Sequence, residues 1–382
     1  MSDQTMAMIH DALAAQGERS YEQAWSMPGA FYCDPRVLSI ERERLFAREW
    51  LCVGRIEEVA HPGDYLSLEL LEEPVVVIHG RDGEIRAFSN VCRHRGMKIA
   101  KGSGNVRTLV CPYHHWTYDL TGRLLAAPHI EAREGFDPTS CRLPELGCEL
   151  WQGFVFVNLD PDAPALAPRL SGLENLTRNY HMEEMKLRYL AEEAWDTNWK
   201  CLVENFMEGY HLSALHRQTL HNVTPTNLCR HFPPGEGYFG YYAGFSARLP
   251  GTSIGHPDLG EEQLDDCIMY AVPPNLTVGG ASDYSSFLCI QPESVERVRI
   301  KLGLIFFGDD WRDEQVDEAV ELFQDTMAED KTVLVELQRG LASRFHAAGP
   351  LAPSGMEGPI RDFYSYLNRT IGPALASQAR LS

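Results

Sequence analysis

Short apolar runs separated by turn residues dominate the chain between residues 45 and 160. Residues 75–79 form one uninterrupted run, and a glycine-containing turn at 81–83 separates it from a second run at 85–88. Two such runs joined by a short turn are typical of a β-hairpin. Hairpin patterns of the same kind recur at 116–125 and 150–159. The pattern therefore predicts a small antiparallel all-β domain.

On either side of this domain the pattern mixes helical and strand-like periods. Asp34-Pro35 predicts the start of a helix near the N-terminus, and the composition of residues 160–164 is that of a linker. The expected helices beyond the linker are at about 169–185, 199–217 and 312–342, and the expected strands are near 236–246, 267–278, 284–291 and 297–307. We predict an N-terminal helical segment (1–44) that packs on the C-terminal domain, an all-β domain (45–160) and an α+β domain with an antiparallel sheet (161–382).

The composition narrows the range of partners. A net charge of −20 argues against nucleic acid and against an anionic membrane surface. No apolar run approaches the ~18 residues of a membrane span, and residues 1–20 lack the pattern of a signal peptide. The ten cysteines show no disulfide framework, so those outside the motif below are expected to be reduced thiols. We expect a cytoplasmic protein.

Two loops of the all-β domain each contain one cysteine and one histidine. The first reads Cys92-Arg93-His94, and the second places His114 three residues after Cys111. Two thiolates on one iron and two imidazoles on the other are the ligands of a Rieske [2Fe–2S] cluster. The alternative is a structural zinc, which also accepts Cys₂His₂. Zinc modules usually pair cysteine with cysteine, so we expect the iron–sulfur cluster.

A second candidate metal site lies in the α+β domain. His211 and His216 are five residues apart, about 140° on an ideal helix, so both reach one metal only if the helix loosens or ends there. Asp330 occupies one position of an otherwise apolar stripe on the last expected helix. The apolar members of that stripe are Val316, Val320, Phe323, Met327, Leu334, Leu337 and Leu341.

A carboxylate in a core stripe requires a cationic partner or a metal. We predict that His211, His216 and Asp330 form a facial triad that binds Fe(II) and leaves positions open for O₂. A buried ion pair is the alternative for Asp330, and Glu329 is the substitute ligand.

Residues 92–116 resemble the cluster-binding part of Rieske non-haem iron oxygenases. Respiratory Rieske proteins normally add two cysteines to these loops, and here Met97 and Tyr113 stand where those are expected. The resemblance extends over roughly residues 28–345 and includes the stretches around His211 and Asp330. It implies the α subunit of a terminal oxygenase, a mono- or dioxygenase whose helix-grip-like catalytic domain contains mononuclear iron.

The resemblance also implies an assembly and a route for electrons. Family members form trimers in which the cluster of one subunit lies near the iron of its neighbour. Glu208 would link His114 of one chain to His211 of the next, or else be an ordinary surface residue, and Asn205 and Glu208 take the catalytic positions. A separate reductase, directly or through a ferredoxin, would deliver electrons from NAD(P)H. The short chain favours a homotrimer over an assembly with a β subunit.

The substrate is the least determined part of the prediction. Family frequency favours hydroxylation or oxidative demethylation of an aromatic compound, whereas a glutamate at position 208 resembles oxygenases of quaternary ammonium compounds such as carnitine. The candidate pocket aromatics are Tyr238, Phe239, Tyr241, Tyr242, Phe245, Tyr270, Tyr284 and Phe287. Asp265, Asp266 and Asp283 are candidates for a cation, and Arg248 for a carboxylate. A Rieske electron carrier without oxygenase activity remains the alternative of another class.

Overall fold

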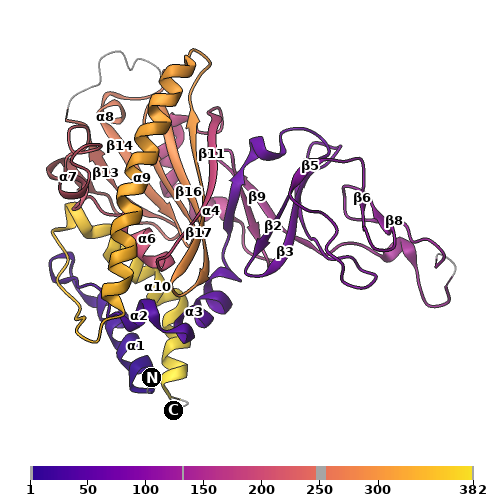
Figure 1. Cartoon of the computed structure of the whole chain (residues 1–382), viewed down its shortest axis with the longest axis horizontal. Coiled ribbons are helices and arrows are strands. Elements are labelled where there is room, and N and C mark those ends of the chain that lie inside the picture. Colours follow the sequence, from indigo (N-terminus) through magenta and orange to yellow (C-terminus); the bar gives the residue numbers. More distant parts are fainter. Residues whose placement is uncertain (1–2, 131–132, 247–254, 381–382) are drawn as a thin grey trace. The chain divides into compact units, whose positions relative to one another are not determined.

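The computed structural model describes residues 3–130, 133–246 and 255–380. The chain divides into two compact units (Figure 1). One, here called the β unit, is Ala47–Leu166. The other, here called the helix–sheet unit, joins Met1–Phe46 to Ala167–Ser382. The N-terminal segment therefore belongs to the same unit as the C-terminal half.

The β unit consists of antiparallel strands, as predicted. A seven-stranded sheet has the order β1-β10-β9-β4-β3-β2-β5, and a three-stranded sheet has the order β6-β7-β8. The strands are β1 Leu51–Arg55, β2 Asp64–Leu70, β3 Glu73–His79, β4 Ile85–Ser89, β5 Ser103–Asn105, β6 Leu109–Val110, β7 Thr117–Tyr118, β8 Leu124–Ala126, β9 Glu145–Trp151 and β10 Phe154–Asn158. Gln152 and Gly153 join β9 to β10 with φ of 48° and 77°, and two positive φ angles suit the twist of a two-residue hairpin.

The helix–sheet unit is built on one antiparallel sheet of order β11-β17-β16-β15-β14-β13-β12. Its strands are β11 Lys186–Trp195, β12 Cys229–His231, β13 Phe239–Gly244, β14 Asp266–Val272, β15 Leu276–Gly280, β16 Tyr284–Ser294 and β17 Arg297–Phe306. Its helices are α1 Asp3–Glu18, α2 Ala30–Cys33, α3 Pro35–Glu41, α4 Leu166–Arg169, α5 Ser171–Thr177, α6 Trp199–Phe206, α7 Leu212–Leu215, α8 Glu261–Leu264, α9 Asp313–Leu341 and α10 Ser354–Arg380.

The long helix α9 lies along one face of this sheet (Figure 1) and contacts α6 and β11. The other long helix, α10, packs against α1, β12 and β13. A sheet that curves around one long helix buries the apolar stripe of that helix in the core. This arrangement confirms the predicted α+β class.

The buried stripe of α9 differs from the predicted one at its C-terminal end. Asp330 is 2 % exposed within the stripe, as predicted, but Leu337 is 43 % exposed. Its predicted place is taken by the buried Gln338, whose Oε1 accepts a hydrogen bond of 2.9 Å from the backbone of Asn198. A buried amide that caps a neighbouring backbone group cannot be distinguished from a surface glutamine by periodicity alone.

Several predicted boundaries were wrong. The expected strand at 267–278 is the hairpin β14–β15, because Pro273-Pro274 cannot donate ladder hydrogen bonds. The expected helix at 169–185 is two short helices, and the one at 199–217 is interrupted between α6 and α7. The sequence reading missed α10, which contains Pro359 and Pro373, and β11. Within the described residues, no helix has both the length and the apolar composition needed to cross a bilayer.

Candidate functional site

The two Cys/His loops of the β unit share one backbone conformation. In the first loop the amide of Cys92 donates to the carbonyl of Met97 at 2.9 Å. In the second loop the amide of Cys111 donates to the carbonyl of Trp116 at 2.8 Å. Each loop thus closes on itself five residues after its cysteine, which holds the intervening histidine in a fixed turn.

A left-handed residue closes each of these turns. Gly96 has φ of 77° and donates from its amide to the carbonyl of Cys92 at 3.0 Å. His115 has φ of 59° and donates in the same way to Cys111, also at 3.0 Å. Glycine adopts this conformation without cost, whereas a histidine there is uncommon and indicates that the surrounding loop imposes it.

The four side chains fit the cluster that the sequence predicts. Cys92 and Cys111 are buried, at 3 % and 2 % exposed. The Nδ1 atoms of His94 and His114 lie 3.1 Å apart, with the His94 ring exposed. Two buried thiols and two facing imidazole nitrogens are the donor set of a [2Fe–2S] centre with an inner and an outer iron.

Tyr118 is a neighbour of the cysteines that the sequence reading missed. Its hydroxyl lies 3.3 Å from Cys92 Sγ, and its oxygen accepts a hydrogen bond of 3.1 Å from the Arg93 amide. The hydroxyl is thus placed to donate to a thiolate at Cys92. Hydrogen bonds to sulfur tune the potential of such a cluster. The only sequence feature that could have indicated this contact is the presence of a tyrosine two residues after Trp116, at the end of the second Cys/His loop.

The second site begins where helix α6 ends. The helix stops at Phe206, and Gly209 passes so close to Cys229 that a Cβ on the glycine would lie 2.3 Å from its Sγ. The short helix α7 follows, with His211 at its N-cap and His216 at its C-cap. The interrupted helix is what allows both histidines to face the same point.

The structure brings the three predicted iron ligands together. His216 Nε2 lies 3.2 Å from Asp330 Oδ1, and His211 Nε2 lies 3.7 Å from the same oxygen. One donor atom from each residue lies within 4.8 Å of the other two. Asp330 Oδ1 is buried and has no hydrogen-bond partner among the described residues. A buried carboxylate oxygen without a donor, facing two imidazole nitrogens, fits a metal ion.

Each histidine contacts a second carboxylate through its other nitrogen. His216 Nδ1 donates to Glu329 Oε2 at 2.7 Å, and Thr219 Oγ1 donates to the same oxygen. His211 Nδ1 donates to Glu208, whose side chain is 11 % exposed. A carboxylate on Nδ1 fixes the tautomer that leaves Nε2 free for a metal. Glu329 therefore contacts the nitrogen of His216 that faces away from Asp330, and the partly buried Glu208 contacts His211 instead of facing solvent as an ordinary surface residue.

These carboxylates also set the electrostatics of the site. Burial lowers the pKa of His216, but the nearby carboxylates of Asp330 and Glu329 outweigh this effect, so the pKa is raised. On the other side of α6, Glu204 accepts a hydrogen bond of 2.9 Å from the Tyr32 hydroxyl. Burial raises the pKa of Glu204 to about 8, although Tyr32 and Lys200 lower it. Because Glu204 contacts Tyr32 and not the triad, it belongs to a separate buried network.

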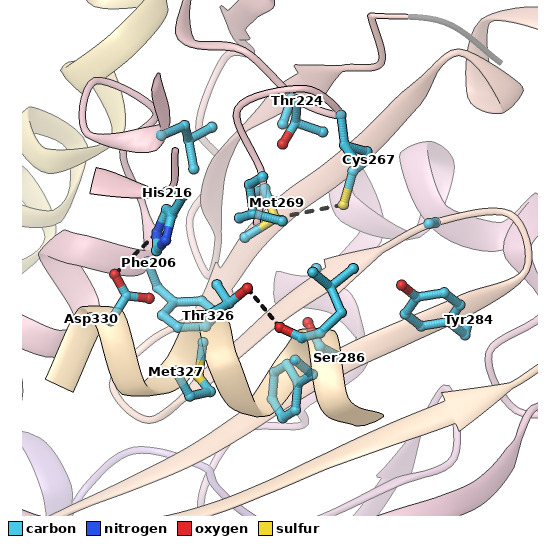
Figure 2. A pocket seen from close by; sticks show the side chains of 18 of the residues that line it. Phe206, His216, Thr224, Cys267, Met269, Tyr284, Ser286, Thr326, Met327 and Asp330 are labelled. Atoms are coloured by element: carbon cyan, nitrogen blue, oxygen red, sulfur yellow. Dashed lines mark hydrogen bonds and ion pairs between the residues drawn. The ribbon is translucent and has the colours of Figure 1, made fainter. Parts of the chain in front are cut away.

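A cavity of about 220 Å³ opens beside the triad, between α9 and the sheet (Figure 2). Five directly paired residues form a row across its sheet wall: Tyr241, Met269, Gly279, Ser286 and Leu304. A side chain at Gly279 would lie within 3.0 Å of both Met269 and Ser286, so the glycine leaves room for a ligand. Asn205 also lines the cavity, and its Nδ2 is buried without a hydrogen-bond acceptor among the described residues.

Successive side chains of strand β13 point to opposite faces of the sheet, so only some of the aromatic residues predicted for the pocket line the cavity. Tyr241 and Phe245 line the cavity, and Tyr284 lines it from β16. Tyr242 faces the other side, where it packs on Phe232. The remaining candidates lie elsewhere: Tyr238 and Phe239 border another hollow with Arg361, Tyr270 donates to Met182, and Phe287 is fully buried. Phe206 and Phe323 also line the cavity, although the sequence reading did not assign them to it.

The three predicted aspartates have different surroundings. Asp266 is paired with Arg230 at 2.6 Å, and Asp265 caps the short helix α8. Asp283 lines the cavity and is 8 % exposed. Arg248 lies outside the described residues.

Comparisons with known proteins agree with both centres. Residues 49–144 match the Rieske [2Fe-2S] domain, and residues 176–372 match the catalytic domain of the ring hydroxylating alpha subunit. The chain is 30 % identical over 332 residues to the carnitine monooxygenase oxygenase subunit of Acinetobacter baumannii, which covers 84 % of this chain and 86 % of that protein. It is 38 % identical over 203 residues to the glycine betaine monooxygenase oxygenase subunit of Pseudomonas aeruginosa, covering 53 % and 47 %.

A solved structure of a quaternary ammonium Rieske monooxygenase superposes with a TM-score of 0.82. The identity is 26 %, and the match covers 95 % of this chain and 98 % of that chain. Both catalytic machinery and fold thus define a class of enzyme, the terminal oxygenases that use a Rieske cluster and mononuclear iron. The chain belongs to the family of Rieske oxygenase α subunits. As an oxygenase subunit, it requires a separate reductase.

Proposed function

We propose that this oxygenase is a monooxygenase of a quaternary ammonium compound. The observation that carries the proposal is the set of side chains that line the cavity beside the triad. It is lined by five aromatic side chains, Phe206, Tyr241, Phe245, Tyr284 and Phe323, and by the carboxyl of Asp283, with no lysine or arginine among its described lining residues. Aromatic faces attract cations, and quaternary ammonium groups are typical ligands of such surfaces.

The relatives support the same substrate class. Two of them are named for carnitine and glycine betaine, and the solved structure is that of a quaternary ammonium monooxygenase. These matches favour a quaternary ammonium substrate, the alternative in the sequence analysis, over the aromatic substrate that was its main expectation. The aromatic walls also suit a neutral ring, and that possibility becomes one arm of the test below.

In this proposal His211, His216 and Asp330 hold the iron, and Cys92 and Cys111 with the two facing histidines hold the cluster. Iron bound with open positions supplies the chemistry of O₂ activation. The carboxylates of Glu208 and Glu329 hold the two imidazoles in the metal-binding tautomer. The apolar walls of the cavity exclude water from the substrate. Asn205 offers its unpaired Nδ2 as a donor at the iron end of the cavity.

The proposed overall reaction is the hydroxylation of a carbon bonded to the ammonium nitrogen. A C–H bond adjacent to the cationic nitrogen becomes C–OH, and the second oxygen atom leaves as water with two electrons and two protons. The hydroxylated carbon then loses its bond to nitrogen. The products are a carbonyl compound, a tertiary amine and a proton.

We also propose that electrons cross between subunits of a homotrimer. Glu208 contacts His211 Nδ1 through one oxygen and accepts from the Tyr210 and His211 amides through the other. Its carboxylate lies on the side of the His211 ring away from Asp330, where this proposal places a histidine of a neighbouring cluster. Inter-subunit electron transfer is described for the related quaternary ammonium Rieske monooxygenase of known structure. In this chain the corresponding contact would join His114 of one subunit to Glu208 of the next.

Single-turnover product analysis tests the proposed substrate. The purified protein is reduced chemically, freed of reductant, given one candidate compound and mixed with oxygenated buffer. We expect amine and carbonyl products, measured by mass spectrometry, from quaternary ammonium compounds and none from benzoate or toluene. Turnover of the aromatic compounds alone would overturn the substrate class. Oxidation of the cluster without any product from either class would instead favour an electron carrier.

A further inference from the structure

Asp283 is a buried carboxylate that contacts neither a basic side chain nor a side-chain hydrogen-bond donor among the described residues. Seven aspartates and glutamates are buried in the described part of the chain. The other six each contact a basic side chain, an arginine, lysine or histidine: Asp34 with Arg36, Glu41 with Lys200, Glu208 with His211, Asp266 with Arg230, Asp330 with His216, and Asp362 with His231. Among the described residues, Asp283 accepts hydrogen bonds from backbone amides alone, its own and that of Tyr284, the latter at 2.9 Å.

The surrounding backbone holds this carboxylate at the cavity. Asp283 immediately precedes β16, and its carbonyl accepts a hydrogen bond of 2.9 Å from the Phe307 amide. That bond ties the residue to the end of β17 while its side chain lines the cavity. Burial raises the pKa of Asp283, as expected for a buried carboxyl with no basic side chain beside it among the described residues. A group this costly to bury indicates a ligand that supplies the missing donor.

Asp283 belongs to the end of the cavity that lies away from the triad. Along α9 the cavity-lining residues run from Asp330 back to Leu322, two helical turns or about 12 Å. Figure 2 shows two neighbours of Asp283 on the side opposite Asp330 and His216. They are Tyr284, which follows it in sequence, and Cys267, whose pKa is raised by burial and by the charge of Asp283. A substrate carbon held at the triad therefore places the remote end of the same molecule near Asp283.

We propose that Asp283 binds the remote end of the substrate and selects a hydrogen-bond donor there, a hydroxyl or an amine, over a carboxylate. This inference rests on the proposed function, in which the reacting end is a quaternary ammonium group. A carboxylate in the same position would face Asp283 in a cavity with mainly apolar walls, where like charges repel more strongly than in bulk water. Carnitine and glycine betaine both carry a carboxylate, so this chain prefers a different remote group from the compounds that name its relatives.

Two matched ligand pairs test the selection directly. Choline and glycine betaine share the trimethylammonium group and differ at the terminal carbon, and 4-hydroxybutyl-trimethylammonium and γ-butyrobetaine form a longer pair. Binding to the anaerobic holoenzyme is measured by calorimetry. We expect the alcohol of at least one pair to bind about tenfold more tightly than its carboxylate, because a hydrogen bond to a charged group is made in one case and a repulsion in the other.

Two variants assign the preference to the residue. Asp283→Asn keeps the shape and the acceptor for the Tyr284 amide but removes the charge, and it is expected to reduce the alcohol preference to about twofold or less. Asp310→Asn makes the same change at an exposed position and is expected to keep the full preference. Equal or tighter binding of the carboxylates by the unaltered enzyme overturns the inference, and that comparison needs no variant to fold.

The outcomes separate this inference from the proposed function. If the carboxylates are bound and oxidised better than the alcohols, the assignment to quaternary ammonium compounds stands and the role of Asp283 falls. If neither pair yields product in a single turnover and the aromatic compounds do, the proposed function falls with it.

Discussion

The Cys/His loops and the His/His/Asp triad are both suited to iron, but they are assembled in opposite ways. The loops place all four donors within residues 92–114 and repeat one local hydrogen-bond pattern in each half. The triad joins helix α7 to helix α9. The contact between His216 and Glu329 beside it connects residues that are 113 positions apart in sequence. The loop histidine His94 is exposed, whereas His216 and Asp330 are 1 % and 2 % exposed.

This difference determines what each centre depends on. The loops need only their own turns, so their geometry is secured once β4, β6 and β7 have formed. The triad needs α9 in register against the sheet, because a shift of one residue along a helix turns a side chain by about 100°. We therefore expect the triad to be the more sensitive centre to changes in core packing and in buried charge.

The largest expected effect separates the two centres. Asp330→Ala removes the only carboxylate of the triad, and we expect product formation to fall to the background of the assay while the visible spectrum of the cluster is unchanged. Single-turnover analysis and absorption spectroscopy on the same sample measure both. Glu336→Ala, on the exposed face of α9, is the matched control and should keep activity. An Asp330→Ala enzyme that still forms product would show that this carboxylate is not an iron ligand.

A smaller loss is expected from the carboxylate behind His216. Glu329→Gln keeps the shape of the side chain but removes the charge that orients the imidazole. Changes of this kind typically cost about 10–100-fold in metal affinity or activity. Iron retention against a chelator, followed over time, gives the measurement. Retention equal to that of the unaltered enzyme would remove Glu329 from the orienting role.

The contrast also explains how far the sequence could be read. The spacing of Cys92, His94, Cys111 and His114 predicts that these side chains lie together, because all four belong to two local turns. The place of Asp330 in an apolar stripe predicts its burial, and it is 2 % exposed. The contact between Glu329 and His216 was not predictable, because Glu329 lies off that stripe and reaches its partner only through tertiary packing. The unpaired state of Asp283 was likewise invisible, since pairing depends on which cations the fold brings near.

Buried charge in the helix–sheet unit predicts a pH dependence of its stability. The pKa of Glu204 rises from 4.5 to about 8 on folding. A raised carboxyl pKa means that the folded state holds the proton more tightly, so stability is greatest below about pH 4.5 for this group and falls as the pH rises towards 8. The slope is at most about 1.4 kcal/mol per pH unit. Denaturant unfolding of the enzyme and of Glu204→Gln between pH 5 and pH 8 measures it, and equal slopes for the two would contradict this assignment.

The smallest expected effect concerns the cluster alone. Tyr118→Phe removes the hydroxyl beside Cys92 Sγ without changing the ring. A hydrogen bond of about 1 kcal/mol that favours the reduced cluster corresponds to about 40 mV for one electron, so the potential should fall by that amount. Spectroelectrochemical titration measures the shift. Iron retention at the triad should be unaffected, and an unchanged potential would show that the tyrosine does not donate to the sulfur.

The central claim is that one chain holds two iron centres of different construction, and iron and sulfide analysis of the purified protein tests it most directly. A [2Fe–2S] cluster and a mononuclear site together predict about three irons and two acid-labile sulfides per chain. We expect Asp330→Ala to lower the iron to about two without loss of sulfide. A ratio of two irons to two sulfides in the unaltered protein, reconstituted with excess Fe(II) under anaerobic conditions, would contradict the account.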